Sequence, residues 1–85
     1  MKRKDAIKEY ANKGCYIVDN YITNDVGGTN LWFVFESYLR AVKWIDSCKK
    51  YYTGDGLQDS EKEGLTDYKF MSPNGTTHRF VLQPI

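Results

Sequence analysis

The chain has 85 residues, a formal net charge of +1 and a mean hydropathy of −0.60. A chain of this length buries one small core, which excludes a second domain, and its seven Tyr, four Phe and two Trp exclude a disordered chain. The near-neutral charge supplies no general attraction to nucleic-acid backbones, which usually bind proteins with a basic face.

The charges are spread unevenly along the chain. Residues 1–13 carry five basic and two acidic side chains, whereas residues 53–67 carry five acidic and one basic. The chain is therefore a weak dipole, and this leaves room for local charged patches.

The first expected element is a helix over residues 5–13, with Asp5 as N-cap and Gly14 as its C-terminal stop. Residues 15–23 are rich in β-branched and aromatic side chains and predict a strand that is apolar on both sides. A loop over residues 24–30 then returns the chain antiparallel into an apolar strand at residues 31–35.

Ser37 is a good N-cap for an amphipathic helix over residues 38–51, whose apolar side chains recur at helical spacing and face the sheet. Residues 53–66 are polar and acidic and predict a mobile loop. Two β-prone runs flank Asn74-Gly75 and predict a second hairpin. We therefore expect a single α+β domain over residues 1–85, in the order α-β-β-α-β-β, with helices packed on a mainly antiparallel sheet.

The inventory of catalytic side chains is thin. His78 is the only histidine, it lies on a predicted strand, and no Ser or Cys is placed by the sequence to use it as a base. Cys15 and Cys48 lack the spacing of a metal site, and the acidic loop does not match the spacing of a calcium-binding loop. We expect a cytoplasmic protein without export signal, membrane span, cofactor, metal or enzymatic activity.

The best candidate site is one flank of the helix over residues 38–51. Trp44 and Tyr51 lie two turns apart on this flank, with basic side chains on the outer side. The competing interpretation is that Trp44 closes the edge of a small core. Acidic side chains of the loop could add charge to the interface. The expected partner-binding residues are Trp44, Tyr51, Arg40, Lys43, Asp59, Glu61 and Glu63.

In size, lack of motifs and a composition rich in Lys, Asn, Tyr and Ile, the chain resembles the small phage-encoded inhibitors of bacterial defence, of the anti-CRISPR type. The resemblance covers the whole chain as a general style, and no functional residue is carried over from it. It implies a protein that binds an effector complex in the host cytoplasm and blocks its access to nucleic acid. The main hypothesis is therefore an inhibitor that occludes a nucleic-acid-handling protein such as a CRISPR effector.

Two alternatives stay open. Residues 32–37 with residues 41–45 resemble the third strand and second helix of an RNA recognition motif, which implies a module that binds single-stranded nucleic acid through sheet aromatics and Lys/Arg. The other alternative is a structural or assembly protein that buries an exposed sheet edge in a homodimer.

Overall fold

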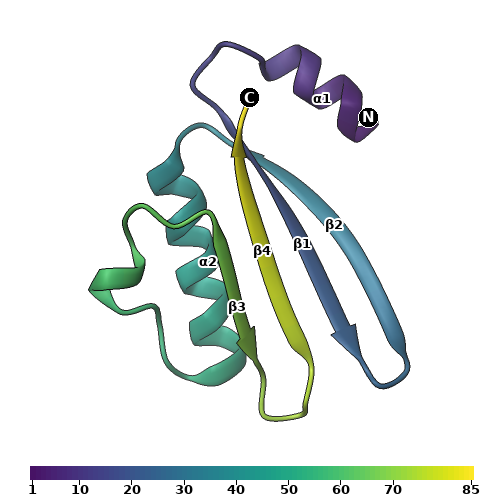
Figure 1. The fold of residues 1–85 in the computed structure, drawn as a ribbon, viewed down its shortest axis with the longest axis vertical. Coiled ribbons are helices and arrows are strands. Elements are labelled where there is room, and N and C mark those ends of the chain that lie inside the picture. Colours follow the sequence, from purple (N-terminus) through teal and green to yellow (C-terminus); the bar gives the residue numbers. More distant parts are fainter.

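A computed structural model describes residues 1–85 as two helices on a four-stranded antiparallel sheet (Figure 1). The elements are α1 (Arg3–Tyr10), β1 (Tyr16–Asn24), β2 (Gly27–Phe35), α2 (Tyr38–Thr53), a short 3₁₀ turn η1 (Asp59–Glu61), β3 (Asp67–Met71) and β4 (Thr77–Pro84). This confirms the predicted α+β class and the order α-β-β-α-β-β.

The sheet consists of two hairpins that lie side by side, in the strand order β2-β1-β4-β3. Tyr16 pairs with Phe35 of β2 on one side and with Pro84 of β4 on the other. β1 is therefore an inner strand with partners on both edges. It is apolar on both faces because both faces are buried, at Val18 on one side of the sheet and at Ile17 on the other.

Helix α2 covers one face of the sheet and encloses the core. Strand residues of even number in β1, β3 and β4 point toward α2, because side chains alternate between the two faces. The buried cluster consists of Val18, Ala41, Val42, Ile45, Leu57, Tyr68, Phe70, Phe80 and Leu82. Each large apolar side chain in it contributes about 2 kcal/mol by leaving water.

Helix α1 lies near the end of the sheet where β1 begins and β4 ends (Figure 1). The predicted bounds of this helix were wrong by two residues at its start and three at its end. Lys2 is the N-cap and Asp5 lies in the first turn, where its charge favours the helix dipole. The helix ends before Gly14 because Ala11 is extended and Asn12 adopts a left-handed conformation, with φ of 62°.

The first hairpin is tighter than the sequence predicts, since the expected loop over residues 24–30 shrinks to the turn residues Asp25 and Val26. The side-chain oxygen of Asn24 accepts hydrogen bonds from the N–H groups of Val26 and Gly27, at 2.9 and 3.1 Å. Gly27 adopts φ of 151°, which an L-residue rarely does. The second hairpin, around Gly75, is confirmed.

The segment between α2 and β3 is tied to the fold at several points. Leu57 is buried in the core, and its N–H donates to the Asp46 carboxylate at 2.6 Å. The Tyr38 hydroxyl donates to the carbonyl of Leu65 at 2.7 Å. The Tyr68 hydroxyl lies 3.3 Å from that of Tyr38 and donates to the carbonyl of Glu61. These hydrogen bonds and the burial of Leu57 therefore hold the loop beside α2.

Candidate protein-interaction site

Helix α2 presents the candidate site, and both of its ends are capped. The Ser37 hydroxyl accepts a hydrogen bond from the N–H of Arg40 at 3.2 Å, which confirms the predicted N-cap. At the other end Gly54 is left-handed and donates its N–H to the carbonyl of Lys50. These caps fix where α2 begins and ends, and the helical spacing of its apolar residues sets which side chains face the sheet.

Trp44 lies on the flank of α2 that faces β2. Its ring is half-buried, with centroids 4.8 Å from Phe33, 5.3 Å from Phe35 and 5.5 Å from Phe80. These contacts make Trp44 part of the margin of the core, as the competing interpretation of the sequence held. Its remaining surface is open along the same flank.

Tyr51 continues this flank two turns further along and is 81% exposed. Its ring makes an edge contact with Tyr52, with centroids 4.9 Å apart. A shallow groove runs between Trp44 and the two tyrosines, past Ser47 and Cys48. Burial raises the pKa of the Cys48 thiol, so the groove carries no charge at neutral pH.

Strand β2 extends this apolar region beyond the helix. Leu31 is 41% exposed and Phe33 is 38% exposed, and both point to the face of the sheet that α2 covers. The aromatic surface is defined here as Leu31, Phe33, Trp44, Tyr51 and Tyr52. The sequence predicted two of its members and missed the β2 residues, because the edge position of β2 depends on the strand order.

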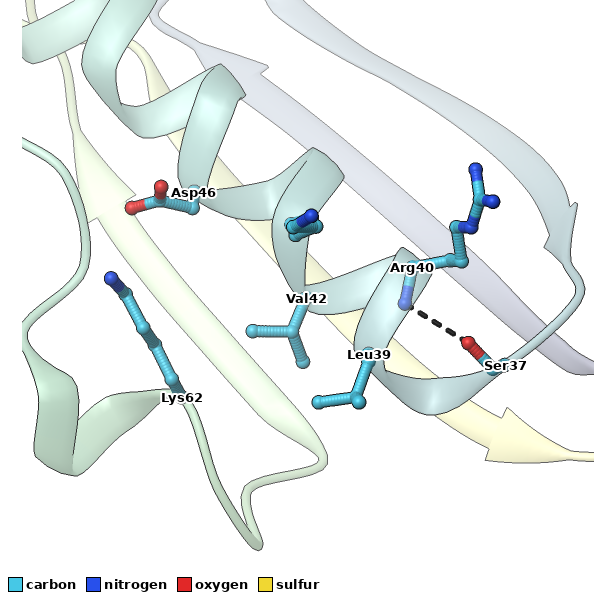
Figure 2. Close-up of a pocket in the computed structure, with 7 residues that line it drawn as sticks. Ser37, Leu39, Arg40, Val42, Asp46 and Lys62 are labelled. Carbon is cyan, nitrogen blue, oxygen red and sulfur yellow. Dashed lines mark hydrogen bonds between the residues drawn. The ribbon is translucent and has the colours of Figure 1, made fainter.

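A second groove, of about 490 Å³, lies on the opposite flank of α2 (Figure 2). Lys43, Lys62 and Asp46 line it, and Arg40 borders it with a guanidinium that points away from Lys62 and Asp46. Figure 2 shows Lys62 and Asp46 on the two sides of the groove. Asp46 forms its ion pair with Lys50, at 3.2 Å.

The carboxylate of Asp46 is held in its charged form. Burial alone would raise its pKa, but the hydrogen bond from the N–H of Leu57 and the Lys50 ammonium outweigh burial and lower it. Asp46 thereby acts as an anchor that holds the loop against α2.

The three acidic residues of the predicted site lie in the loop, beside the second groove. Asp59 is exposed and pairs with Lys62 at 3.6 Å. The Glu61 carboxylate accepts a hydrogen bond from the N–H of Gln58 at 3.0 Å and so caps η1. Glu63 is exposed. The structure therefore separates this acidic group from Trp44 and Tyr51 by the width of α2.

His78 lies in the core at the far end of α2, 3% exposed, with its ring stacked between Tyr52 and Phe70. Its Nε2 has no hydrogen-bond partner, and burial lowers its pKa. No group of three or more His, Cys, Asp or Glu side chains is arranged to hold a metal ion.

No protein-family model matches this chain, and comparisons with curated proteins and with solved structures find no similar protein. None of its helices combines the length and the apolar character that crossing a bilayer requires. The fold and its exposed surfaces are therefore the basis for a functional proposal.

Proposed function

We propose that this chain is a small protein-binding module that docks through its aromatic surface. The observation that carries the proposal is the exposure of Tyr51 next to the open edge of Trp44, along an uncharged groove. The fold makes little use of the Tyr51 ring, whose aromatic contact is with Tyr52 alone. Aromatic anchors of this kind commonly supply about 2 kcal/mol or more each when a partner covers them.

The proposed mode of action is occlusion of a nucleic-acid-handling protein, such as a CRISPR effector. The size and composition of the chain support this mode through their resemblance to phage-encoded inhibitors. Asp59 and Glu63 are exposed on the other side of α2, so they would compete with phosphate only on a partner that also reaches around the helix.

Direct binding of single-stranded nucleic acid receives less support from the geometry. That function needs aromatic rings on an open sheet surface for base stacking. Phe33 and Phe35 instead pack against the Trp44 ring, on the face of the sheet that α2 covers. Arg40 precedes Trp44 by one helical turn and so lies on the flank of the rings, whereas Lys43 and Lys62 line the second groove, so the cations are divided between the two flanks of α2.

The experiment is an affinity capture from bacterial lysate, with and without nuclease, using the parent chain and two tyrosine variants. Tyr51→Ala removes the exposed anchor. Tyr21→Thr removes a tyrosine from the opposite face of the sheet while keeping a strand-forming residue. We expect one stoichiometric protein that resists nuclease, is retained by Tyr21→Thr and is lost with Tyr51→Ala.

The captured protein then allows the inhibitory mode to be measured. Adding the parent chain should reduce nucleic-acid binding by the captured protein, and Tyr51→Ala should not. Equal capture by the two variants would contradict the proposed surface. Capture that disappears with nuclease would favour the nucleic-acid alternative.

A further inference from the structure

The outer edge of β2 is long and uncharged. β2 lies at one end of the strand order, so one side of its backbone has no partner strand. Its nine residues, GGTNLWFVF, include no Asp, Glu, Lys, Arg or Pro. At about 3.4 Å per residue the edge spans about 30 Å, which is most of the longest dimension of the molecule, 38 Å.

The opposite edge of the sheet is protected in a way that β2 is not. β3 has five residues and carries Asp67 and Lys69. Short edges and charged side chains are the usual means by which proteins prevent strands of different molecules from pairing. The difference between the two edges singles out β2 as a place for a further strand.

The hydrogen-bond pattern identifies the backbone groups that β2 leaves free. The N–H of Leu82 donates to the carbonyl of Thr66, so alternate residues of β4 counted from Leu82 face away from β1. Antiparallel pairs alternate regularly, and the registers carry this alternation through β1 to β2. Asn30, Trp32 and Val34 consequently turn their N–H and C=O groups toward the open edge.

The side chains of β2 match a second copy of the same strand. Leu31 and Phe33 lie two residues apart on one face and are both partly exposed. Antiparallel pairing centred on Trp32 places Leu31 of each copy opposite Phe33 of the other. The same register places Asn30 opposite Val34, and no charged side chain meets another. Such apolar cross-strand pairs stabilise a sheet.

We propose that two copies of this chain pair through β2, antiparallel and with Trp32 on the two-fold axis, to form one continuous sheet of eight strands. The pairing is isologous, so it uses both β2 edges and leaves only the charged β3 edges outside. Assembly therefore stops at the dimer. The proposal does not depend on the proposed function, because the dimer forms from this chain alone.

The register is tested by cysteine cross-linking in a chain whose Cys15 and Cys48 have been replaced by Ser. Directly opposed residues of a hydrogen-bonded antiparallel pair have Cα atoms about 5.5 Å apart, which suits a disulfide. Oxidation should link Trp32→Cys to itself. Asn30→Cys and Val34→Cys should link to each other in a mixture but not to themselves.

The cross-linking control is Val26→Cys, in a turn position that is 96% exposed. We expect it to stay monomeric on a non-reducing gel. Cross-linking of Val26→Cys as fast as Trp32→Cys would indicate random collision and would overturn the proposal. The proposal would also be overturned if a mixture of Asn30→Cys and Val34→Cys formed no cross-linked dimer.

Sedimentation equilibrium on the parent chain gives a second test. We expect a dimer whose fraction falls on dilution. Asn30→Pro should be monomeric, since it removes one outward N–H while leaving the pairing with β1, and Asn30→Ala should still dimerise. A parent chain that is monomeric up to millimolar concentration would overturn the proposal, including the case in which the edge accepts only a strand of another protein.

Discussion

The imidazole of His78 on β4 is stacked on the phenol ring of Tyr52 in the last turn of α2, with ring centroids 4.3 Å apart. This contact closes α2 onto the sheet at the end away from Ser37. It also buries a titratable ring whose Nε2 has no partner.

The buried state of His78 predicts a loss of stability in mild acid. Burial lowers the pKa of His78 below its ordinary value of 6.5, so below that pH the unfolded chain binds a proton more readily than the folded chain. The contribution of neutral His78 to the free energy of unfolding is complete above about pH 6.5 and is lost as the pH falls through the folded-state pKa. Melting temperatures are measured from pH 7.5 to about 5. The melting temperature of the parent chain should fall more steeply with decreasing pH than that of His78→Phe. Parallel curves for the two chains would contradict this.

The ion pair between Arg3 and Asp19 should stabilise the docking of α1. Arg3 donates to both carboxylate oxygens, at 2.8 and 2.6 Å, and the Asp19 side chain is only 9% exposed. Arg3→Met leaves this carboxylate without its partner, and we expect a loss of about 1 to 2 kcal/mol in the free energy of unfolding. Arg3→Lys should recover only part of this loss. Lys keeps the positive charge but cannot donate in the same forked geometry.

A matched control exists on the same sheet. Arg79 makes the same two-pronged contact with Asp67, but both side chains are about half exposed, at 50% and 48%. Arg79→Met should therefore shift the urea midpoint less than Arg3→Met does. An equal or larger shift would show that burial of Asp19 does not set the strength of its pair.

The two tyrosines that hold the loop should control its opening. Burial and the neighbouring Tyr38 hydroxyl raise the pKa of Tyr68 far above its usual range, so its phenol stays a donor to the carbonyl of Glu61. Tyr68→Phe should lower the free energy of unfolding by about 1 kcal/mol and speed amide hydrogen exchange in residues 54–66. Tyr16→Phe, which removes the hydroxyl of a half-buried strand tyrosine, should leave that exchange unchanged. Unchanged amide exchange in Tyr68→Phe would show that the hydrogen bond from Tyr68 to Glu61 does not hold the loop.

Trp44 and Tyr51 should contribute very different amounts to the free energy of unfolding. Trp44→Ala removes three ring contacts and should lower the free energy of unfolding by about 2 kcal/mol or more. Tyr51→Ala should change it by less than about 0.5 kcal/mol, because the ring is mostly in water. Urea titrations of the two variants measure this difference. Tyr51 is therefore the cleaner probe of partner binding.

Local sequence signals account for most of the observed elements. The Ser37 cap, the helical spacing of Ala41, Val42 and Ile45, and the turn at Gly75 each act within a few residues, and the structure confirms them. The pairing of β1 with β4 joins segments that are distant in sequence, and no local pattern encodes it. The exposed edge of β2 follows from that pairing and was equally out of reach.

The candidate site was partly predictable for the same reason. Trp44 and Tyr51 share a flank because both belong to one helix, and spacing alone fixes that relation. The loop lies on the other flank because Leu57 is buried and donates to Asp46, a contact that a single Leu among polar residues does not reveal. Its acidic residues could not be placed relative to Trp44 from the sequence.

The inner position of β1 has a consequence for synthesis of the chain. β1 and β2 can pair as soon as residues 16–35 have been made, but the second partner of β1 spans Thr77–Pro84. Closing this long-range contact must overcome the loop-closure entropy of the intervening residues, so we expect it to form after the first hairpin. Until β4 emerges from the ribosome, the first hairpin has both backbone edges open, and this is the stage at which the nascent chain is most exposed to aggregation.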